Sequence, residues 1–185
     1  MRMKKLAGIV VLLGCSILAA GQGADQAGPV PHSNYRILTT IPLGGAGLWD
    51  RMAVDSNERR LYVPRDTHVA VLDVDTGVTV GDVVGTQGAH AVALAPELGR
   101  GFASNGRRNT VSVFDLKTFR TIGEVKTGRN PDAMVYDSAS KTVFAMNSRD
   151  RSITAISAAD GKVLGTIQLV EDPKMQWPMA KVVST

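Results

Sequence analysis

The sequence contains very little cysteine, since Cys15 is the only one among 185 residues. One thiol cannot form an intramolecular disulfide, which excludes the disulfide-stapled secreted folds and leaves the folded part without thiol chemistry. Aromatic residues make up only 5% of the chain, too few for a typical base-stacking surface. Residues 35–170 show no apolar stripe at helical spacing with capping residues, which excludes repeats that contain helices. Stability must therefore come from burial and from sheet hydrogen bonds.

The overall composition is that of an ordinary globular protein, with 44% hydrophobic and 21% charged residues. The formal net charge is +4, and Arg2, Lys4 and Lys5 supply three of those charges. Residues 1–21 contain no acid, so their removal would leave a net charge of +1. The basic character is thus largely confined to the N-terminus, and it argues little for a nucleic-acid partner.

The N-terminus has the three parts of a secretory signal. Residues 1–5 are basic, residues 6–13 are apolar apart from one glycine, and Ala19, Ala20 and Gly21 form a small-residue exit. The apolar run is too short for a comfortable membrane span of about 20 residues. We therefore predict a cleaved signal over residues 1–21, a flexible lead-in over residues 22–34, and a periplasmic or secreted bacterial protein. An uncleaved anchor is the alternative.

A second interpretation of this segment involves Cys15. Residues 12–15 read Leu-Leu-Gly-Cys, which resembles a bacterial lipobox with Cys15 as the lipid-bearing residue. The apolar run before Cys15 is short and continues after it, which argues against lipidation. The signal or this lipid would be the only links to a membrane.

An internal repeat determines the predicted fold. Short, alternating, β-branched segments recur with a spacing of 42 residues, most clearly at 69–73, 111–115 and 153–157. Each unit has four such segments, joined by turn residues such as Asn105-Gly106. The other predicted strands are 51–55, 60–63 and 78–84, then 91–95, 100–103 and 120–125, then 133–137, 142–145 and 162–167. Four short strands per unit is the pattern of a propeller blade, and a stacked solenoid is the main competitor.

The predicted fold class is all-β, a partial β-propeller of about three four-stranded blades plus an extra N-terminal strand at residues 35–41. The propeller is predicted to span residues 35–169, with blades at about 42–83, 84–125 and 126–167. The repeat is lost after residue 169, so residues 170–185 are predicted to be a divergent C-terminal tail.

Several motifs resemble the YVTN-repeat β-propellers, the YncE-like group of bacterial exported proteins. They are Trp49-Asp50, Leu-Tyr-Val-Pro at 61–64, Gly-Ala-His-Ala-Val-Ala-Leu at 88–94, Gly-Arg-Gly-Phe at 99–102, Ser-Asn-Gly at 104–106, Thr-Val-Ser-Val-Phe-Asp at 110–115 and Asn-Pro-Asp-Ala at 130–133. The resemblance implies a propeller fold and implies little about activity, because the family has few assigned chemistries. Its members close rings of about seven blades. Three full units allow three interpretations: a truncated or frameshifted product, a half-propeller that dimerises, and an arc that is stable as a monomer.

The loops before each first strand and between second and third strands should share one face near the propeller axis, because strands alternate in direction. This is the natural binding face. Its candidate ligand-binding residues are Trp49, Asp50, His68, His90, Asn105, Arg107, Asp132 and Arg149. Seven arginines also fall there: Arg51, Arg65, Arg107, Arg108, Arg129, Arg149 and Arg151. They favour an anionic ligand or a protein partner, although tight turns also need polar residues for solvation alone.

Metal binding and catalysis find weaker support. His68 and His90 with Asp50 and Asp132 offer ligands for a mixed nitrogen and oxygen metal site. Their spacing in the sequence, however, matches no metal-binding motif. We therefore predict no metal, no cofactor and structural histidines. No serine elbow, phosphate loop or haem motif is found, so no catalytic residue is predicted. The recurring Asp73 and Asp115 are predicted to cap turns, and Trp49 more often fills space between blades than stacks on a ligand.

The leading functional hypothesis is an exported, non-enzymatic binding or interaction scaffold. Its partner would be an unknown protein, an anionic small molecule or a second copy of the chain, with nucleic acid disfavoured. A lactonase-like propeller hydrolase, or an accessory of a periplasmic dehydrogenase, is the enzyme alternative. A fragment without independent function is the third.

Overall fold

The computed structural model describes residues 36–43 and 50–169. The chain divides into two units, Met1–Thr40 and Ile41–Thr185. In the first unit only residues 36–40 are described, and they form no helix or strand. Among the residues that the structure describes, no helix has the length and apolar character needed to cross a membrane.

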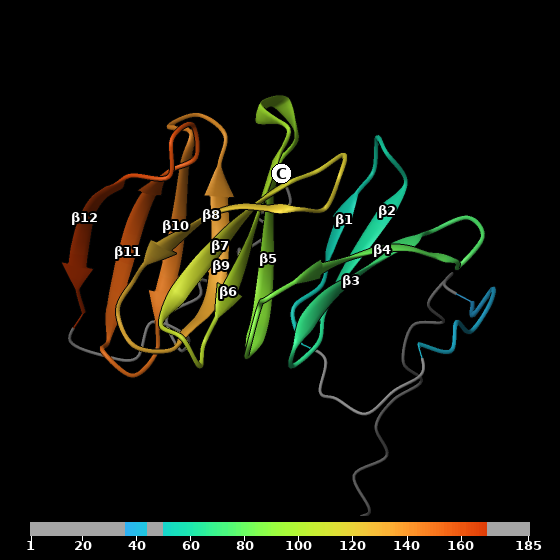
Figure 1. Ribbon diagram of the computed structural model, residues 1–185, viewed down its shortest axis with the longest axis horizontal. Helices are drawn as coiled ribbons and strands as arrows, with labels where there is room; N and C mark the ends of the chain where they lie inside the picture. The colour runs from blue at the N-terminus through green and yellow to red at the C-terminus, as the bar shows by residue number, and fades with distance from the viewer. Residues whose placement is uncertain (1–35, 44–49, 170–185) are drawn as a thin grey trace, which may run out of the picture. The chain divides into compact units, whose positions relative to one another are not determined.

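Residues 50–169 contain twelve strands, which form three four-stranded antiparallel sheets, each a consecutive meander (Figure 1). The middle sheet, β5–β8, lies between the other two. Blade 1 contains β1 (Ala53–Asp55), β2 (Arg60–Pro64), β3 (His68–Asp73) and β4 (Thr79–Val84). Blade 2 contains β5 (Ala89–Ala95), β6 (Arg100–Asn105), β7 (Thr110–Asp115) and β8 (Thr121–Lys126). Blade 3 contains β9 (Pro131–Asp137), β10 (Thr142–Asn147), β11 (Ser152–Ser157) and β12 (Val163–Gln168). The fold is all-β, a partial β-propeller.

Side-chain alternation gives each blade two packing faces. We call the face toward the next blade in the chain the forward face and the opposite one the backward face. The forward face of blade 1 carries Tyr62, Val69, Val71 and Val83, which pack against blade 2 residues that include Phe114. The rings of Tyr62 and Phe114 lie 5.9 Å apart between centroids.

The same positions recur in blade 2. Its forward face carries Phe102, Val111, Val113 and Val125, which pack against blade 3. Strand register confirms the equivalence, because Tyr62 pairs with Val71 as Phe102 pairs with Val113. The two interfaces between blades are therefore formed by equivalent residue positions.

The predicted extra strand at residues 35–41 is not found, since the described part, residues 36–43, contains no strand. A strand needs a neighbour to accept and donate its backbone hydrogen bonds, and no described strand pairs with this segment. Ile41 and Leu43 instead use their side chains, which pack against a cluster of Val63, Ala70 and Leu72. These three residues form the backward face of blade 1.

Asp73 and Asp115 cap turns, as predicted. Asp73 Oδ1 accepts the backbone N–H groups of Asp75 and Thr76 at 3.1 and 2.8 Å. Asp115 Oδ1 accepts those of Lys117 and Thr118 at 3.0 and 2.7 Å. The pKa of each carboxyl lies below its ordinary value, chiefly because of the backbone hydrogen bond from the threonine in each turn.

These caps predict a specific loss of stability in acid. A carboxyl whose pKa is lower in the folded state stabilises the fold above its unfolded pKa, and this contribution disappears as pH falls through the folded value. We expect the double variant Asp73→Asn/Asp115→Asn to show a smaller drop in urea midpoint between pH 7 and pH 3 than the wild type. An equal drop in both proteins would contradict the prediction. Glu58→Gln, which removes a carboxylate elsewhere in a turn, is the control.

Candidate functional site

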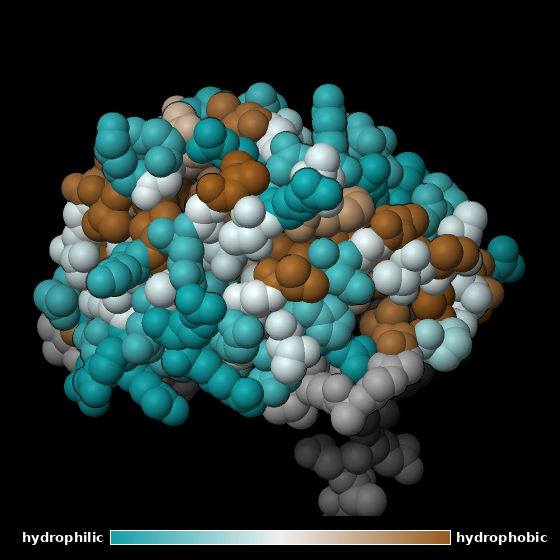
Figure 2. Space-filling model, in the orientation of Figure 1, coloured by the Kyte–Doolittle hydropathy of each residue, from teal (hydrophilic) through white to brown (hydrophobic). Residues whose placement is uncertain are grey.

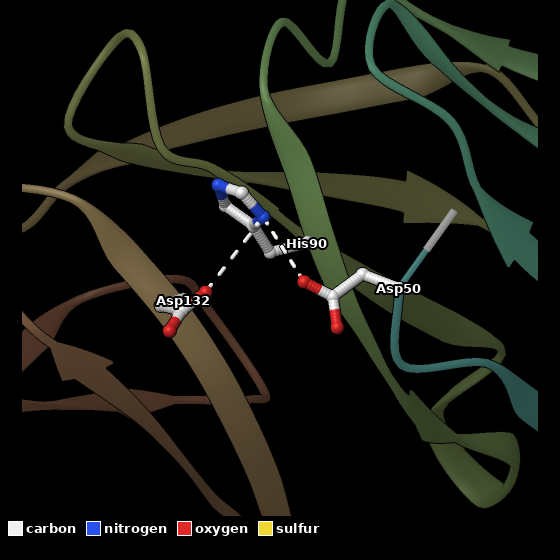
Figure 3. A group of neighbouring side chains, drawn as sticks. All are labelled: Asp50, His90 and Asp132. Carbon is white, nitrogen blue, oxygen red and sulfur yellow. Dashed lines mark hydrogen bonds and ion pairs between the residues drawn. The ribbon is translucent and has the colours of Figure 1, made fainter. Parts of the chain in front are cut away.

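Asp50, His90 and Asp132 meet at one point, with one residue contributed by each blade (Figure 3). They are separated by 40 and 42 residues, the same offsets that relate Arg60, Arg100 and Thr142 at the start of the second strands. Each stands at or just before the start of an innermost strand: Asp50 before β1, His90 in β5 and Asp132 in β9. The three residues of the cluster therefore occupy the same position in the three repeats.

The two carboxylates flank the imidazole of His90 (Figure 3). His90 Nδ1 lies 3.2 Å from Asp50 Oδ2 and 3.7 Å from Asp132 Oδ1. One oxygen or nitrogen atom from each of the three residues lies within 4.8 Å of the others. The Asp132 side chain is only 2% exposed, whereas those of His90 and Asp50 are 35% and 40% exposed. The site thus has a buried floor and an open side.

Arg51 supplies a positive charge to this cluster. Its Nη1 lies 3.9 Å from the Oδ1 atoms of both Asp50 and Asp132, and it donates a hydrogen bond of 3.3 Å to the Asp132 carbonyl oxygen. Its backbone N–H donates to the His90 carbonyl oxygen at 2.9 Å. Two carboxylates therefore lie beside one guanidinium in this cluster.

The position of His90 depends on the missing side chain at Gly106. A Cβ at Gly106 would lie 2.9 Å from His90 Nε2 and 2.7 Å from Asn130 Oδ1. Asn130 has a positive φ of 55° and is held in turn by Asn109 and Ser148. The glycine lets the loop between β6 and β7 approach the start of β5.

A pocket of roughly 430 Å³ adjoins the cluster and reaches along the innermost strands. Arg51 is its polar edge, and the remaining lining residues are apolar: Met52, Ala91, Val92, Ala133, Met134 and Met146. Its size and apolar lining, beside a few convergent charges, are typical of small-molecule sites.

Asn105, another predicted ligand-binding residue, has a structural role. It is fully buried, and its Nδ2 donates to Thr110 Oγ1 at 3.0 Å and Ser112 Oγ at 2.8 Å. Asn147 makes the same two bonds, at 3.0 and 2.9 Å, to Ser152 and Thr154. The amide nitrogen therefore holds the second and third strands together in two blades.

The seven arginines predicted on the binding face, which we call the rim arginines, are mostly in ion pairs with carboxylates. Besides Arg51, three of them contact carboxylates: Arg107 with Asp66 at 2.7 Å, Arg108 with Glu124 at 2.9 Å and Arg129 with Asp150 at 2.5 Å. Arg65 is buried. Arg149 and Arg151 are exposed, and neither forms an ion pair with a carboxylate of the described residues.

His68, a further candidate, does not join the cluster. His68 Nε2 lies 3.7 Å from Asp82 and its Nδ1 lies 3.0 Å from Thr67 Oγ1, a local arrangement within blade 1. Trp49 and Cys15 lie outside the described residues. The sequence offers all three residues of the cluster, but no local metal-binding motif groups them. When residues are counted back from the last residue of each first strand, all three occupy the same repeat position.

Comparisons with known proteins agree with this architecture. No protein-family model and no curated protein matches the chain. Among solved structures, hydrazine synthase from Kuenenia stuttgartiensis is similar, with a TM-score of 0.64 and 19% identity over 75% of this chain and 40% of that one. U3-55K is similar with a TM-score of 0.60 and 11% identity, over 70% of this chain and 42% of that one.

Both neighbours are propeller-type folds. The described chain is therefore propeller-like by its own topology and by likeness to solved structures. At these identities the likeness concerns the fold alone, and this chain spans less than half the length of either neighbour. Membership in the YVTN-repeat family stays a prediction.

Proposed function

We propose that this chain is an exported, non-enzymatic binding scaffold that holds a small cationic ligand at Asp50, His90 and Asp132. The observation that carries the proposal is the convergence of one repeat position from three blades beside an apolar pocket. Rings of side chains around a propeller axis are suited to binding because rigid strands position them. Residues 1–21 support export, which the intact mass of the purified protein checks.

The charge balance favours a cation over the anion expected from the rim arginines. Two carboxylates outnumber the single guanidinium of Arg51 in the cluster. A ligand with an ammonium group would place its charge between Asp50 and Asp132 and lay an apolar body against Met52 and Met134. The guanidinium of Arg51 already lies near both carboxylates, so it would compete with the ammonium group for them.

Because Arg51 and the ligand would compete, two variants should change the affinity for n-hexylammonium in opposite directions. Isothermal titration calorimetry measures this affinity. Asp132→Asn keeps the shape of the site and removes a charge, so affinity should fall about tenfold, which corresponds to roughly 1.4 kcal/mol. Arg51→Ala removes the competing cation and should raise affinity. Asp66→Asn, a carboxylate paired with Arg107 outside the cluster, is the matched control and should change nothing. Absence of binding, or equal effects in all three variants, would refute the proposal.

An anionic partner is the second candidate, favoured by the exposure of Arg149 and Arg151 on the loops of the same face. A parallel titration with inorganic phosphate separates the two candidates. Binding that weakens in Arg149→Ala but not in Asp132→Asn would assign the face to an anion.

A further inference from the structure

Among the residues that the structure describes, blade 3 leaves exposed a face whose counterparts are buried in blades 1 and 2. Its forward face carries Phe144, Ile153, Ala155 and Ile167. The register identifies them, since Phe144 pairs with Ala155 and Ile153 with Ile167, as Tyr62 pairs with Val71 and Val69 with Val83 in blade 1.

The burial of these equivalent positions differs sharply. All four forward residues of blade 1 are 0% exposed, and those of blade 2 are at most 8% exposed. In blade 3, Phe144, Ile153 and Ala155 are half-buried and Ile167 is 50% exposed. Apolar residues are also exposed on the outer strands β4 and β8, where Figure 2 shows brown patches within a mainly hydrophilic surface. The face of blade 3 differs from those scattered residues because both of its counterparts are interfaces.

The backward face of a following blade covers this position in both existing interfaces. Ala103 and Phe114 pack against blade 1, and the equivalent Ala145 and Ile156 pack against blade 2. The chain carries a third backward face of the same kind on blade 1, where Val63 and Leu72 occupy the equivalent positions.

This third backward face is covered in the structure by Ile41 and Leu43. The cover consists of a segment without strand structure, not of a four-stranded sheet. A blade docking there would bury more apolar surface than two side chains do, which favours exchange of one cover for the other.

We propose that the forward face of blade 3 docks on the backward face of blade 1 of a second copy, displacing Ile41 and Leu43. Two copies related by a two-fold axis make this contact twice and close a ring of six blades, a number within the known range of propellers. Each new interface continues the series formed by the two interfaces within the chain. This inference is independent of the ligand proposed above.

The test is the solution mass of the purified chain, measured by size-exclusion chromatography with light scattering over a concentration series. The wild type should be a dimer. Ile167→Glu places a charge in the contact at a position that is half exposed in one copy, so it should give a folded monomer. Ile122→Glu, a 55% exposed position on the outer strand of blade 2, should remain a dimer.

A second variant tests the displacement. Ile41→Ala/Leu43→Ala weakens the internal cover, so the dissociation constant of the dimer should fall, by about tenfold or more. Cooperative thermal unfolding of each variant shows that it is folded, and Ile153→Glu replaces Ile167→Glu if the latter is not. A monomeric wild type at all concentrations would overturn the proposal, whether residues 170–185 or another protein cover the face. A dimer unaffected by both glutamate variants would overturn it as well.

Discussion

Replacing Phe114 with alanine is expected to lower the free energy of unfolding by roughly 3–5 kcal/mol. Phe114 is fully buried at the interface of blades 1 and 2, where its ring packs against Tyr62. Removing the ring deletes apolar contacts and leaves a cavity between two sheets that are each held rigid by their own hydrogen bonds. Urea denaturation followed by circular dichroism measures the change.

The control for this variant is Ile122→Ala, which truncates an apolar side chain that is already 55% exposed. It should cost less than about 0.5 kcal/mol, as surface substitutions usually do. If the two variants lose similar stability, the interface between blades 1 and 2 does not hold the fold together as described.

Gly101→Ala is expected to destabilise the fold by roughly 1–3 kcal/mol, as overpacking does. Gly101 pairs directly with Phe114 across β6 and β7. A Cβ at this position would overlap Phe114 Cζ and Cε2 and would lie 2.7 Å from Cε1. The ring cannot move away easily because it is fully buried.

The double variant Gly101→Ala/Phe114→Ala gives the sharper result. Once the ring is absent, the added methyl group meets no obstacle, so the double variant should lose clearly less stability than the sum of the single losses. Gly123→Ala is the matched control in β8, since a Cβ there would meet only Val113 Cβ at 3.9 Å, an ordinary van der Waals contact. It should be neutral or slightly stabilising. Additive losses at Gly101 and Phe114 would contradict the proposed overlap.

The repeat made the blades readable from the sequence, because alternation within short strands and a fixed spacing are local signals. The strand predicted at 35–41 failed for a non-local reason. Its composition favours a strand, but strand formation depends on an available edge, and composition does not specify a partner. The structure shows Ile41 and Leu43 covering a face instead.

In the candidate site, too, local signals could be predicted from the sequence and non-local contacts could not. Asp50, His90 and Asp132 could be named in advance because each stands in a loop or strand start on one face. Their convergence required the strands to be aligned to one another, which a search for local metal motifs does not do. The pairing of Arg107 with Asp66, 41 residues apart, connects loops of two blades and has no local signal.

The matched forward and backward faces also bear on how such a chain can evolve. Blade 2 packs on blade 1 with one face and on blade 3 with the other, through equivalent positions, so a copied unit would insert a sheet that presents the same two faces to its neighbours. Gene duplication can therefore lengthen the array in single steps without passing through poorly packed intermediates. Each added unit would bring its own residue to the position of Asp50, His90 and Asp132, so growth of the array and change of its binding chemistry are coupled.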